Sequence, residues 1–267
     1  MLLLAGLTMS NEAFMSYGWR IPFLASVLLL AVGLYIRVKI DETPVFTAEV
    51  TRRRAATAPF VEAVKQQPRE IVFASGVLVM VFAFVYLVLG YLVSYGTATL
   101  GLGRTTVVAI TILASAVYAL AIVLSAALSD RVGRRAVLVG ANAVAVVWAL
   151  ALFPLLDSAS AATLAVGACV TTFIAGFAHG PVGAFMPELF HTRYRYSATG
   201  FSYNVAGVLG GAVPPVIAAA ITAAYGGFVF GIFLAVLCLI SLGCTLALRE
   251  TREYDMDRVE TKAVTTS

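Results

Sequence analysis

The chain has 267 residues, of which 61% are hydrophobic and only 12% are charged. A soluble globular domain has roughly 45–50% apolar and about 25% charged residues, because its surface must be covered by polar side chains. This composition excludes an ordinary water-soluble domain and predicts a chain that lies largely in lipid. The formal net charge of +4 comes from unevenly spread basic residues, a pattern that favours a membrane-topology signal over nucleic-acid binding.

The first nine residues are apolar but too few to cross a bilayer. They also lack the basic leader of a signal peptide. The stretch is typical of the second half of a helix, so we expect the chain to be the carboxyl-terminal part of a larger protein. A short interfacial segment is the alternative interpretation.

Seven longer apolar stretches follow, each of about 20 residues, which is the length of a membrane-spanning helix. They cover residues 19–36, 71–93, 105–128, 136–156, 162–186, 199–223 and 228–248. Charged or turn-rich breaks separate them, and a bilayer tolerates such breaks only at its surface or in a protein-lined cavity. The predicted fold class is therefore an all-α integral membrane protein.

Basic residues set the predicted orientation, because short loops rich in Lys and Arg stay in the cytoplasm. If the seven spans alternate in direction, all 18 Lys and Arg residues except Arg20 and Arg104 fall on one side of the membrane. We expect that side, together with the carboxyl terminus, to be cytoplasmic. The expected location is the cell membrane, crossed several times.

One long connection divides the chain, and its Pro residues and Arg52-Arg53-Arg54 run are typical of a cytoplasmic linker. An amphipathic helix is expected near residues 60–67. The predicted parts are the end of one helix and a complete helix (1–36), the linker (37–70), a six-helix transmembrane bundle (71–248) and a solvated cytoplasmic tail (249–267).

No Asp, Glu, Lys or Arg lies in the middle of a predicted span, although such residues usually mark ion and proton pathways. His179 is the only group at mid-depth that titrates near neutral pH. It shares one helix face with Thr172, Gly176 and Gly183. The stripe predicts either contact with a solute or proton, or a hydrogen-bonded histidine at a helix interface, which the Gly176 to Gly180 spacing favours.

Helix-breaking residues interrupt two spans at mid-depth. Gly180-Pro181 follows His179 directly, and Pro214-Pro215 lies in the next span. Both remove helical hydrogen bonds, and transporters use discontinuous helices to present backbone groups to a ligand; an ordinary kink is the alternative. Asn204 and Tyr86 are the further polar groups expected to line a cavity. Four polar residues share a face of the third predicted span, where inter-helix hydrogen bonding explains them as well as solute contact does: Thr111, Ser115, Tyr118 and Ser125.

Motifs of soluble enzymes are missing from the sequence. There is no Walker loop and no His-Glu-x-x-His, and Gly101-Leu102-Gly103 lacks the third glycine of a dinucleotide site. Cys169, Cys238 and Cys244 lie in apolar runs without the spacing of a zinc site. We expect no enzymatic activity, no metal and no cofactor.

Two predicted cytoplasmic connections carry more specific patterns. Residues 130–135 (Asp-Arg-Val-Gly-Arg-Arg) resemble the D-R-x-G-R-R motif of the major facilitator superfamily, between its eighth and ninth helices. Residues 187–195 (Pro-Glu-Leu-Phe-His-Thr-Arg-Tyr-Arg) are similar to the P-E-L-F-P-T-R-x-R segment after the tenth helix. Residues 18–23 and 42–46 resemble the sixth helix and following loop of the metabolite:proton symporter family. The matches fall in the family's order.

The resemblance implies the carboxyl-terminal six-helix half of a major-facilitator fold, plus the preceding helix and part of another. It implies a proton-coupled symporter that moves a small organic acid or zwitterionic solute by alternating access. The implied partners are this solute, protons, the lipid bilayer and a missing amino-terminal half, with no nucleic acid. The alternative is a transport-inactive truncated half, or a module that requires a separate amino-terminal half.

The residues alone suggest that Asp130 caps the next helix, that Gly133 permits a tight turn, and that Arg134 and Arg135 hold the cytoplasmic surface. The resemblance adds a conformational gate of seven residues, in which Glu188 and Arg195 are partners. The gate residues are Asp130, Arg131, Gly133, Arg134, Arg135, Glu188 and Arg195, and the substrate-binding residues are Tyr86, His179 and Asn204.

Two positions depart from the family patterns. Ala126 stands where glycine is usual, and His191 stands where proline is usual. We therefore expect an altered approach of the neighbouring helix and a looser turn.

Overall fold

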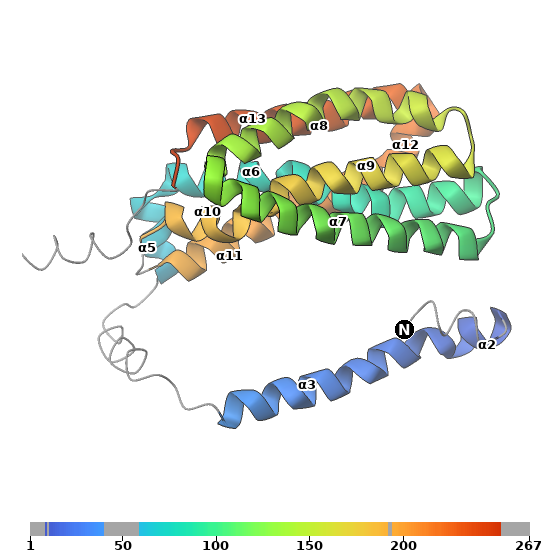
Figure 1. Cartoon of the computed structure of the whole chain (residues 1–267), viewed down its shortest axis with the longest axis horizontal. Helices are drawn as coiled ribbons and strands as arrows, with labels where there is room; N and C mark the ends of the chain where they lie inside the picture. Colours follow the sequence, from blue (N-terminus) through green and yellow to red (C-terminus); the bar gives the residue numbers. More distant parts are fainter. Residues whose placement is uncertain (1–8, 10, 40–58, 192–193, 252–267) are drawn as a thin grey trace, which may run out of the picture. The chain divides into compact units, whose positions relative to one another are not determined.

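The computed structural model describes residues 9, 11–39, 59–191 and 194–251. The chain divides into two units, residues 1–58 and 59–267, and each is considered by itself (Figure 1). Every regular element in the described ranges is helical. Four features of the sequence analysis lie outside the described residues. They are the predicted half-helix at 1–8, the segment 42–46 that resembles the symporter family, the Arg52-Arg53-Arg54 run and the tail beyond Thr251.

The first unit contains a short helix α2 (Asn11–Ser16), a single 3₁₀ turn η1 (Gly18–Arg20) and the helix α3 (Ile21–Lys39). The span predicted over 19–36 is thus a helix. Its apolar stretch, Phe23–Ile36, is shorter than the six long apolar helices of the second unit. Large apolar side chains such as Leu24 and Leu29 are exposed on α3, so this helix requires lipid or other protein surface around it.

The second unit begins with α5 (Pro59–Gln66), which confirms the helix expected near 60–67. Six helical segments long and apolar enough to cross a membrane follow, in agreement with the last six predicted spans. They are formed by α6 (Pro68–Tyr86) with the π-helical turns η2 (Leu87–Leu92) and η3 (Tyr95–Thr99); α7 (Arg104–Val132); α8 (Arg134–Leu156); α9 (Ala161–His179) with α10 (Val182–Leu189); α11 (Arg195–Ala206) with the π-helical η4 (Gly207–Ala212) and α12 (Val213–Tyr225); and α13 (Gly227–Ala247).

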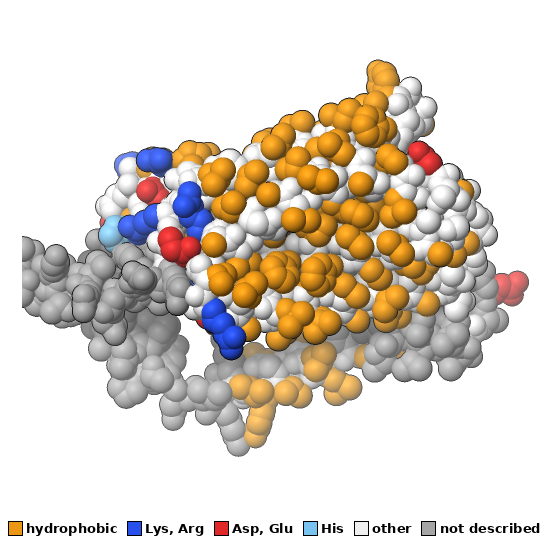
Figure 2. Space-filling view, turned by 45° about the horizontal axis from the view of Figure 1, so that its top comes forward, with side chains coloured by type: hydrophobic (Ala, Val, Ile, Leu, Met, Phe, Trp, Pro, Cys, Tyr) orange, Lys and Arg blue, Asp and Glu red, His pale blue; other side chains and the backbone are white. Residues whose placement is uncertain are grey.

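Within this bundle α7 packs along α9, α8 packs against α9 and α13, and α6 contacts α9, α11 and α13 (Figure 1). Hydrophobic side chains cover the sides of the bundle, whereas Lys and Arg gather at one end, near α5 and α10 (Figure 2). We call this the basic end. The α7–α8 connection, the end of α10, the start of α11 and residues 248–251 after α13 also lie there (Figure 1).

The helix α6 is the most deeply buried of the six spans, as expected for a helix that is apolar on every face. The Ser241 hydroxyl of α13 forms two hydrogen bonds with the backbone of α6. It donates to the Gly76 carbonyl (2.8 Å) and accepts from the Met80 amide (2.9 Å). These two backbone groups stand four residues apart, so the hydroxyl bridges them within the helix. The bridge fixes α13 against α6.

Both predicted helix interruptions are present. The chain leaves the α-helix at Gly180 and Pro181, and the π-helical turn η4 directly precedes the Val213-Pro214 step. A third irregularity, η2, was not predicted; it contacts α12, and Gly90 lies beside Pro215. Widened turns of this kind occur frequently at functional sites.

Gly210→Ala is expected to destabilise the bundle, because a Cβ there would lie 2.2 Å from the Val79 carbonyl oxygen of α6. Backbone must then move, at a cost of about 1–3 kcal/mol. The matched control is Gly207→Ala, where nothing lies within 4 Å of the added atom. The midpoint of thermal unfolding in detergent should fall for the first variant only, and equal midpoints would contradict the close contact of η4 with α6.

Candidate functional site

His179 is the last residue of α9 and lies at the helix interruption. Its Nδ1 atom is hydrogen-bonded to the Tyr118 hydroxyl of α7. The two ring centroids are 5.9 Å apart, and the ring of Tyr203 from α11 lies 6.4 Å from the His179 ring on another side. Three helices thus meet at one histidine and two tyrosines, which we call the His179 cluster.

Gly176 in α9 and Gly180, directly after its last residue, bring this helix close to α7. A Cβ at Gly176 would lie 2.6 Å from the Tyr118 carbonyl oxygen, and one at Gly180 would lie 2.5 Å from the Ile122 carbonyl oxygen. One turn before Gly176, the Thr172 hydroxyl donates to the Ala114 carbonyl of α7 (2.9 Å). The small and polar stripe of α9 therefore faces α7 as far as Gly180. The structure shows the interface hydrogen bond that was one of the two interpretations of His179, and this bond leaves a functional role for the ring open.

Tyr86, the second predicted binding residue, is 47% exposed at the end of α6. Its ring centroid lies 6.3 Å from that of Phe82, and the ring centroids of Phe82 and Tyr203 are 6.2 Å apart. A row of aromatic contacts consequently joins Tyr86 to the His179 cluster. Sequence reasoning did not single out Tyr203, because only the folded bundle brings α11 to the end of α9.

Asn204 is exposed on α11, where its side-chain amide donates to the Gly200 carbonyl of its own helix (2.7 Å). It lines an open cavity of about 640 Å³ that also includes Arg195 and Thr199. The structure thus places Asn204 beside a predicted gate residue. Among the described hydrogen bonds, none joins Asn204 to His179.

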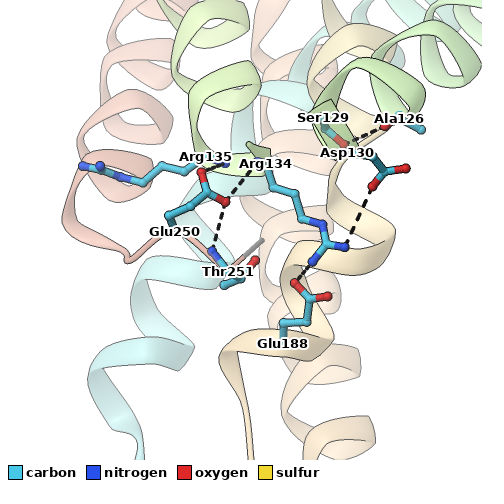
Figure 3. A network of polar contacts seen from close by, with 8 residues as sticks. All are labelled: Ala126, Ser129, Asp130, Arg134, Arg135, Glu188, Glu250 and Thr251. Atoms are coloured by element: carbon cyan, nitrogen blue, oxygen red, sulfur yellow. Dashed lines mark hydrogen bonds and ion pairs between the residues drawn. The ribbon is translucent and has the colours of Figure 1, made fainter. Parts of the chain in front are cut away.

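A second group of functional candidates lies at the basic end (Figure 3). Arg134, the first residue of α8, forms an ion pair with Glu188 of α10. Its other terminal nitrogen lies 4.0 Å from Asp130. The side chains of Arg134 and Glu188 are 15% and 8% exposed, against 71% for Asp130. A buried charge depends strongly on its partner, so Glu188 is the main partner of Arg134 and Asp130 is peripheral.

The described ion pair of Glu188 is with Arg134, whereas the Nε atom of Arg195 donates to the Phe190 carbonyl (3.4 Å). The expected partnership of Glu188 with Arg195 in the gate stays a prediction. Arg195 begins α11 and turns toward the preceding chain. Arg131 is exposed near the end of α7.

The carboxylate that caps α8 comes from Glu250, beyond the end of α13. The amides of Arg134 and Arg135 each donate to one of its oxygens at 3.0 Å (Figure 3). The prediction that Asp130 caps α8 was wrong, because Asp130 lies in the last turn of α7. A carboxylate at a helix amino terminus satisfies unpaired amides and interacts favourably with the helix dipole.

Arg135 also joins the start of α8 to the end of α13. Its guanidinium donates to the carbonyls of Thr245 (3.3 Å) and Leu246 (2.7 Å) at the end of α13. Gly133 between α7 and α8 has a φ of +104°, and a Cβ there would lie 2.7 Å from the Glu250 carboxylate. Only glycine fits this turn without strain or collision.

Gln67, between α5 and α6, holds the α10–α11 connection. Its side chain donates to the Leu189 carbonyl (3.3 Å) and accepts from the His191 amide (3.2 Å). Proline, usual at position 191 in the resembling motif, has no amide hydrogen to donate. The turn that we expected to be looser at His191 is therefore held by hydrogen bonds to Gln67 in this chain. Nearby, burial raises the pKa of Tyr194, and the negative charges of Glu62 and Glu70 raise it further.

Comparison with known proteins gives a family match over most of the chain. The model described as Major Facilitator Superfamily matches residues 3–215 and 97–264, in two overlapping alignments.

Curated relatives also align over nearly the whole chain. The chain is 32% identical to the inner membrane metabolite transport protein YhjE of Escherichia coli, over 95% of this chain and 59% of that protein. It is 30% identical to the Escherichia coli shikimate transporter, over 91% and 57% respectively. It is 25% identical to the glycine betaine/proline/ectoine/pipecolic acid transporter OusA of Dickeya dadantii, over 90% and 50%. The chain thus spans little more than half the length of these relatives.

Glu188→Gln is expected to destabilise the folded bundle by about 3 kcal/mol, because it leaves the buried Arg134 without a countercharge. Asp130→Asn is the matched control, since this exposed carboxylate should contribute less than about 1 kcal/mol. The free energy of unfolding in mixed detergent micelles measures both. Equal losses in the two variants would contradict the assignment of Glu188 as the main partner.

Glu250→Ala is expected to accelerate amide hydrogen exchange at Arg134 and Arg135 by about fivefold, as the loss of a helix cap worth about 1 kcal/mol predicts. Asp130→Ala serves as the control, because the Asp130 side chain is not the cap. Residue-resolved hydrogen exchange distinguishes the two carboxylates. Faster exchange in the Asp130 variant alone would restore Asp130 as the cap.

Proposed function

Since the chain belongs to the major facilitator superfamily, we propose that it forms the carboxyl-terminal helix bundle of a proton-coupled secondary transporter. The transported solute is a small organic acid or a zwitterion, and the protein moves it across the cell membrane by alternating access. The relatives carry the names of transport proteins, which supports transport rather than an enzymatic reaction. Because the chain spans 50–59% of these relatives, the activity is proposed for the complete protein.

The observation that carries proton coupling is the His179 cluster. Five long stretches of the bundle contain no Asp, Glu, Lys or Arg: 71–103, 105–129, 136–156, 158–187 and 196–248. Within these stretches His179 is the one residue of the type whose ordinary pKa, about 6.5, lies near neutral pH. It lies at a helix interruption, beside two tyrosines of other helices. We propose that His179, Tyr86 and Asn204 face the solute pathway.

The proposed gate is the set of charged residues at the basic end. Arg134 ties the α7–α8 turn to Glu188, and Glu188 lies in α10, which begins just after the interruption at Gly180-Pro181. A change at the His179 cluster can therefore reach the ion pair through one short helix. Asp130, Arg131, Gly133, Arg135 and Arg195 complete this gate. Coupling requires that loaded and empty states interconvert while half-loaded states do not.

We propose that the basic end faces the cytoplasm. Lys and Arg gather at this end of the bundle (Figure 2), whereas Arg104 begins α7 at the opposite end. Short basic connections stay on the cytoplasmic side. This orientation places the residues after α13, and so the carboxyl terminus, in the cytoplasm.

Gradient-driven uptake tests the function directly. Liposomes that contain the complete protein are offered shikimate, glycine betaine, proline and a dicarboxylate, with and without an inward proton gradient. We expect at least one solute to enter faster with the gradient, by roughly the 5- to 150-fold that a coupling free energy of about 1–3 kcal/mol provides. If no solute of the panel responds to the gradient, the proposed symport is contradicted.

His179→Gln should abolish the acceleration by the gradient, because glutamine takes up no proton near neutral pH. His191→Gln is the matched control, since His191 is the chain's other histidine and contributes its backbone amide to the described contacts. Liposomes containing only the 267-residue chain test the alternative that a separate amino-terminal half is required. Uptake that is gradient-driven in the complete protein and absent with the chain alone would favour that alternative.

A further inference from the structure

The His179 ring has one described hydrogen bond, from Nδ1 to the Tyr118 hydroxyl. Among the residues that the structure describes, no side chain or carbonyl is bonded to Nε2. The ring therefore has one nitrogen fixed to α7 and one nitrogen free for another partner. Which nitrogen of a neutral histidine carries the proton is set by the hydrogen bond that the other nitrogen makes.

The groups that face His179 are uncharged. Tyr118 reaches it from α7 and Tyr203 from α11, and Phe82 of α6 contacts Tyr203 rather than the histidine. No Asp, Glu, Lys or Arg occurs in the segments of the bundle that pack around it. These segments are 71–103 (α6 and its extension), 105–129 (α7), 136–156 (α8), 158–187 (α9 and most of α10) and 196–248 (α11 to α13). The Tyr118 hydroxyl is consequently the described polar group that decides how the His179 ring is protonated.

We propose that Tyr118 is a positioning residue that selects the tautomer of His179. A phenol hydroxyl can donate or accept, whereas an unprotonated imidazole nitrogen only accepts. The proposal assigns the donor role to the Tyr118 hydroxyl and the acceptor role to Nδ1, which places the ring proton of the neutral histidine on Nε2. The neutral histidine then offers an N–H to the solute pathway. A carboxylate oxygen is the solute group that fits this donor, in agreement with an organic acid or a zwitterion.

The same hydroxyl also fits the protonated histidine. When His179 gains a proton, the new N–H forms at Nδ1 and the Tyr118 hydroxyl turns to accept from it, so Tyr118 stays neutral. A backbone carbonyl at this place could only accept, and a lysine could only donate. Tyr118 therefore maintains one hydrogen bond to His179 in both charge states. The close contacts of Gly176 and Gly180 with α7 hold the two rings in register.

The solute pathway in this inference rests on the proposed function, whereas the tautomer assignment does not. Nuclear magnetic resonance of histidine labelled with ¹³C and ¹⁵N reports the tautomer in the complete protein in lipid. The His179 signals are assigned by their loss in His179→Gln. At a pH well above the ordinary histidine pKa of about 6.5, the wild type should show the Nε2–H form. Tyr118→Phe should lower the ratio of Nε2–H to Nδ1–H by about two- to tenfold, the effect of one neutral hydrogen bond.

Tyr203→Phe is the matched control, because the described contact of Tyr203 with His179 is between the rings, and it should leave the tautomer ratio unchanged. An Nδ1–H form in the wild type would overturn the proposal without any variant. An unchanged ratio in Tyr118→Phe, or an equal change in Tyr203→Phe, would overturn it as well. Because Tyr118→Phe retains the ring, the variant should elute as a folded protein.

Uptake of the solute that responds to the proton gradient supplies a second readout. Tyr118→Phe should displace the pH profile of this uptake, whereas Tyr203→Phe should retain the wild-type profile. A changed tautomer ratio with an unchanged pH profile would refute the positioning role while leaving symport intact. If the wild type shows no gradient-driven uptake, symport fails, and the tautomer ratio still decides whether Tyr118 positions His179.

Discussion

The close contact of α7 with α9 sets the positions of the groups that matter here. Gly176 of α9 and Gly180, directly after this helix, lie so near the α7 backbone that a side chain at either position would collide with a carbonyl oxygen. In a bilayer, small residues allow this approach, and inter-helix hydrogen bonds contribute to it. The approach brings the Tyr118 hydroxyl to His179, the last residue of α9. The Gly180-Pro181 step then redirects the chain into α10.

The helix α10 connects the middle of the bundle with its basic end. It has 8 residues, begins after the interruption and contains Glu188 near its end. Glu188 pairs with Arg134, whose backbone amide is capped by Glu250, while Arg135 binds the end of α13. The α7–α8 turn is thus held by α10 on one side and by α13 on the other (Figure 3). Because removing one partner of a buried ion pair is strongly destabilising, the stability of this junction depends on the Arg134–Glu188 pair.

Bilayer thickness made the six long spans and both helix interruptions predictable, because each span needs about 20 apolar residues and proline lacks an amide hydrogen. The capping carboxylate was not predictable in the same way. Asp130 and Glu250 have the same chemistry, and Glu250 stands 116 residues after Arg134 in the chain. The partner of Glu188 and the contribution of Tyr203 likewise depend on helix packing. The π-helical turn at Leu87–Leu92 has no signal in its residues beyond a single glycine.

We propose that the close contact of α7 and α9 positions His179 for the proton coupling proposed above. Proton-gradient-driven uptake by Gly180→Ala and Gly183→Ala variants of the complete protein tests it most directly. A Cβ at position 180 would lie 2.5 Å from the Ile122 carbonyl oxygen, whereas nothing lies within 4 Å of one at position 183. The account predicts that uptake per folded molecule is lost in the first variant and retained in the second. Equal uptake by both variants would contradict it.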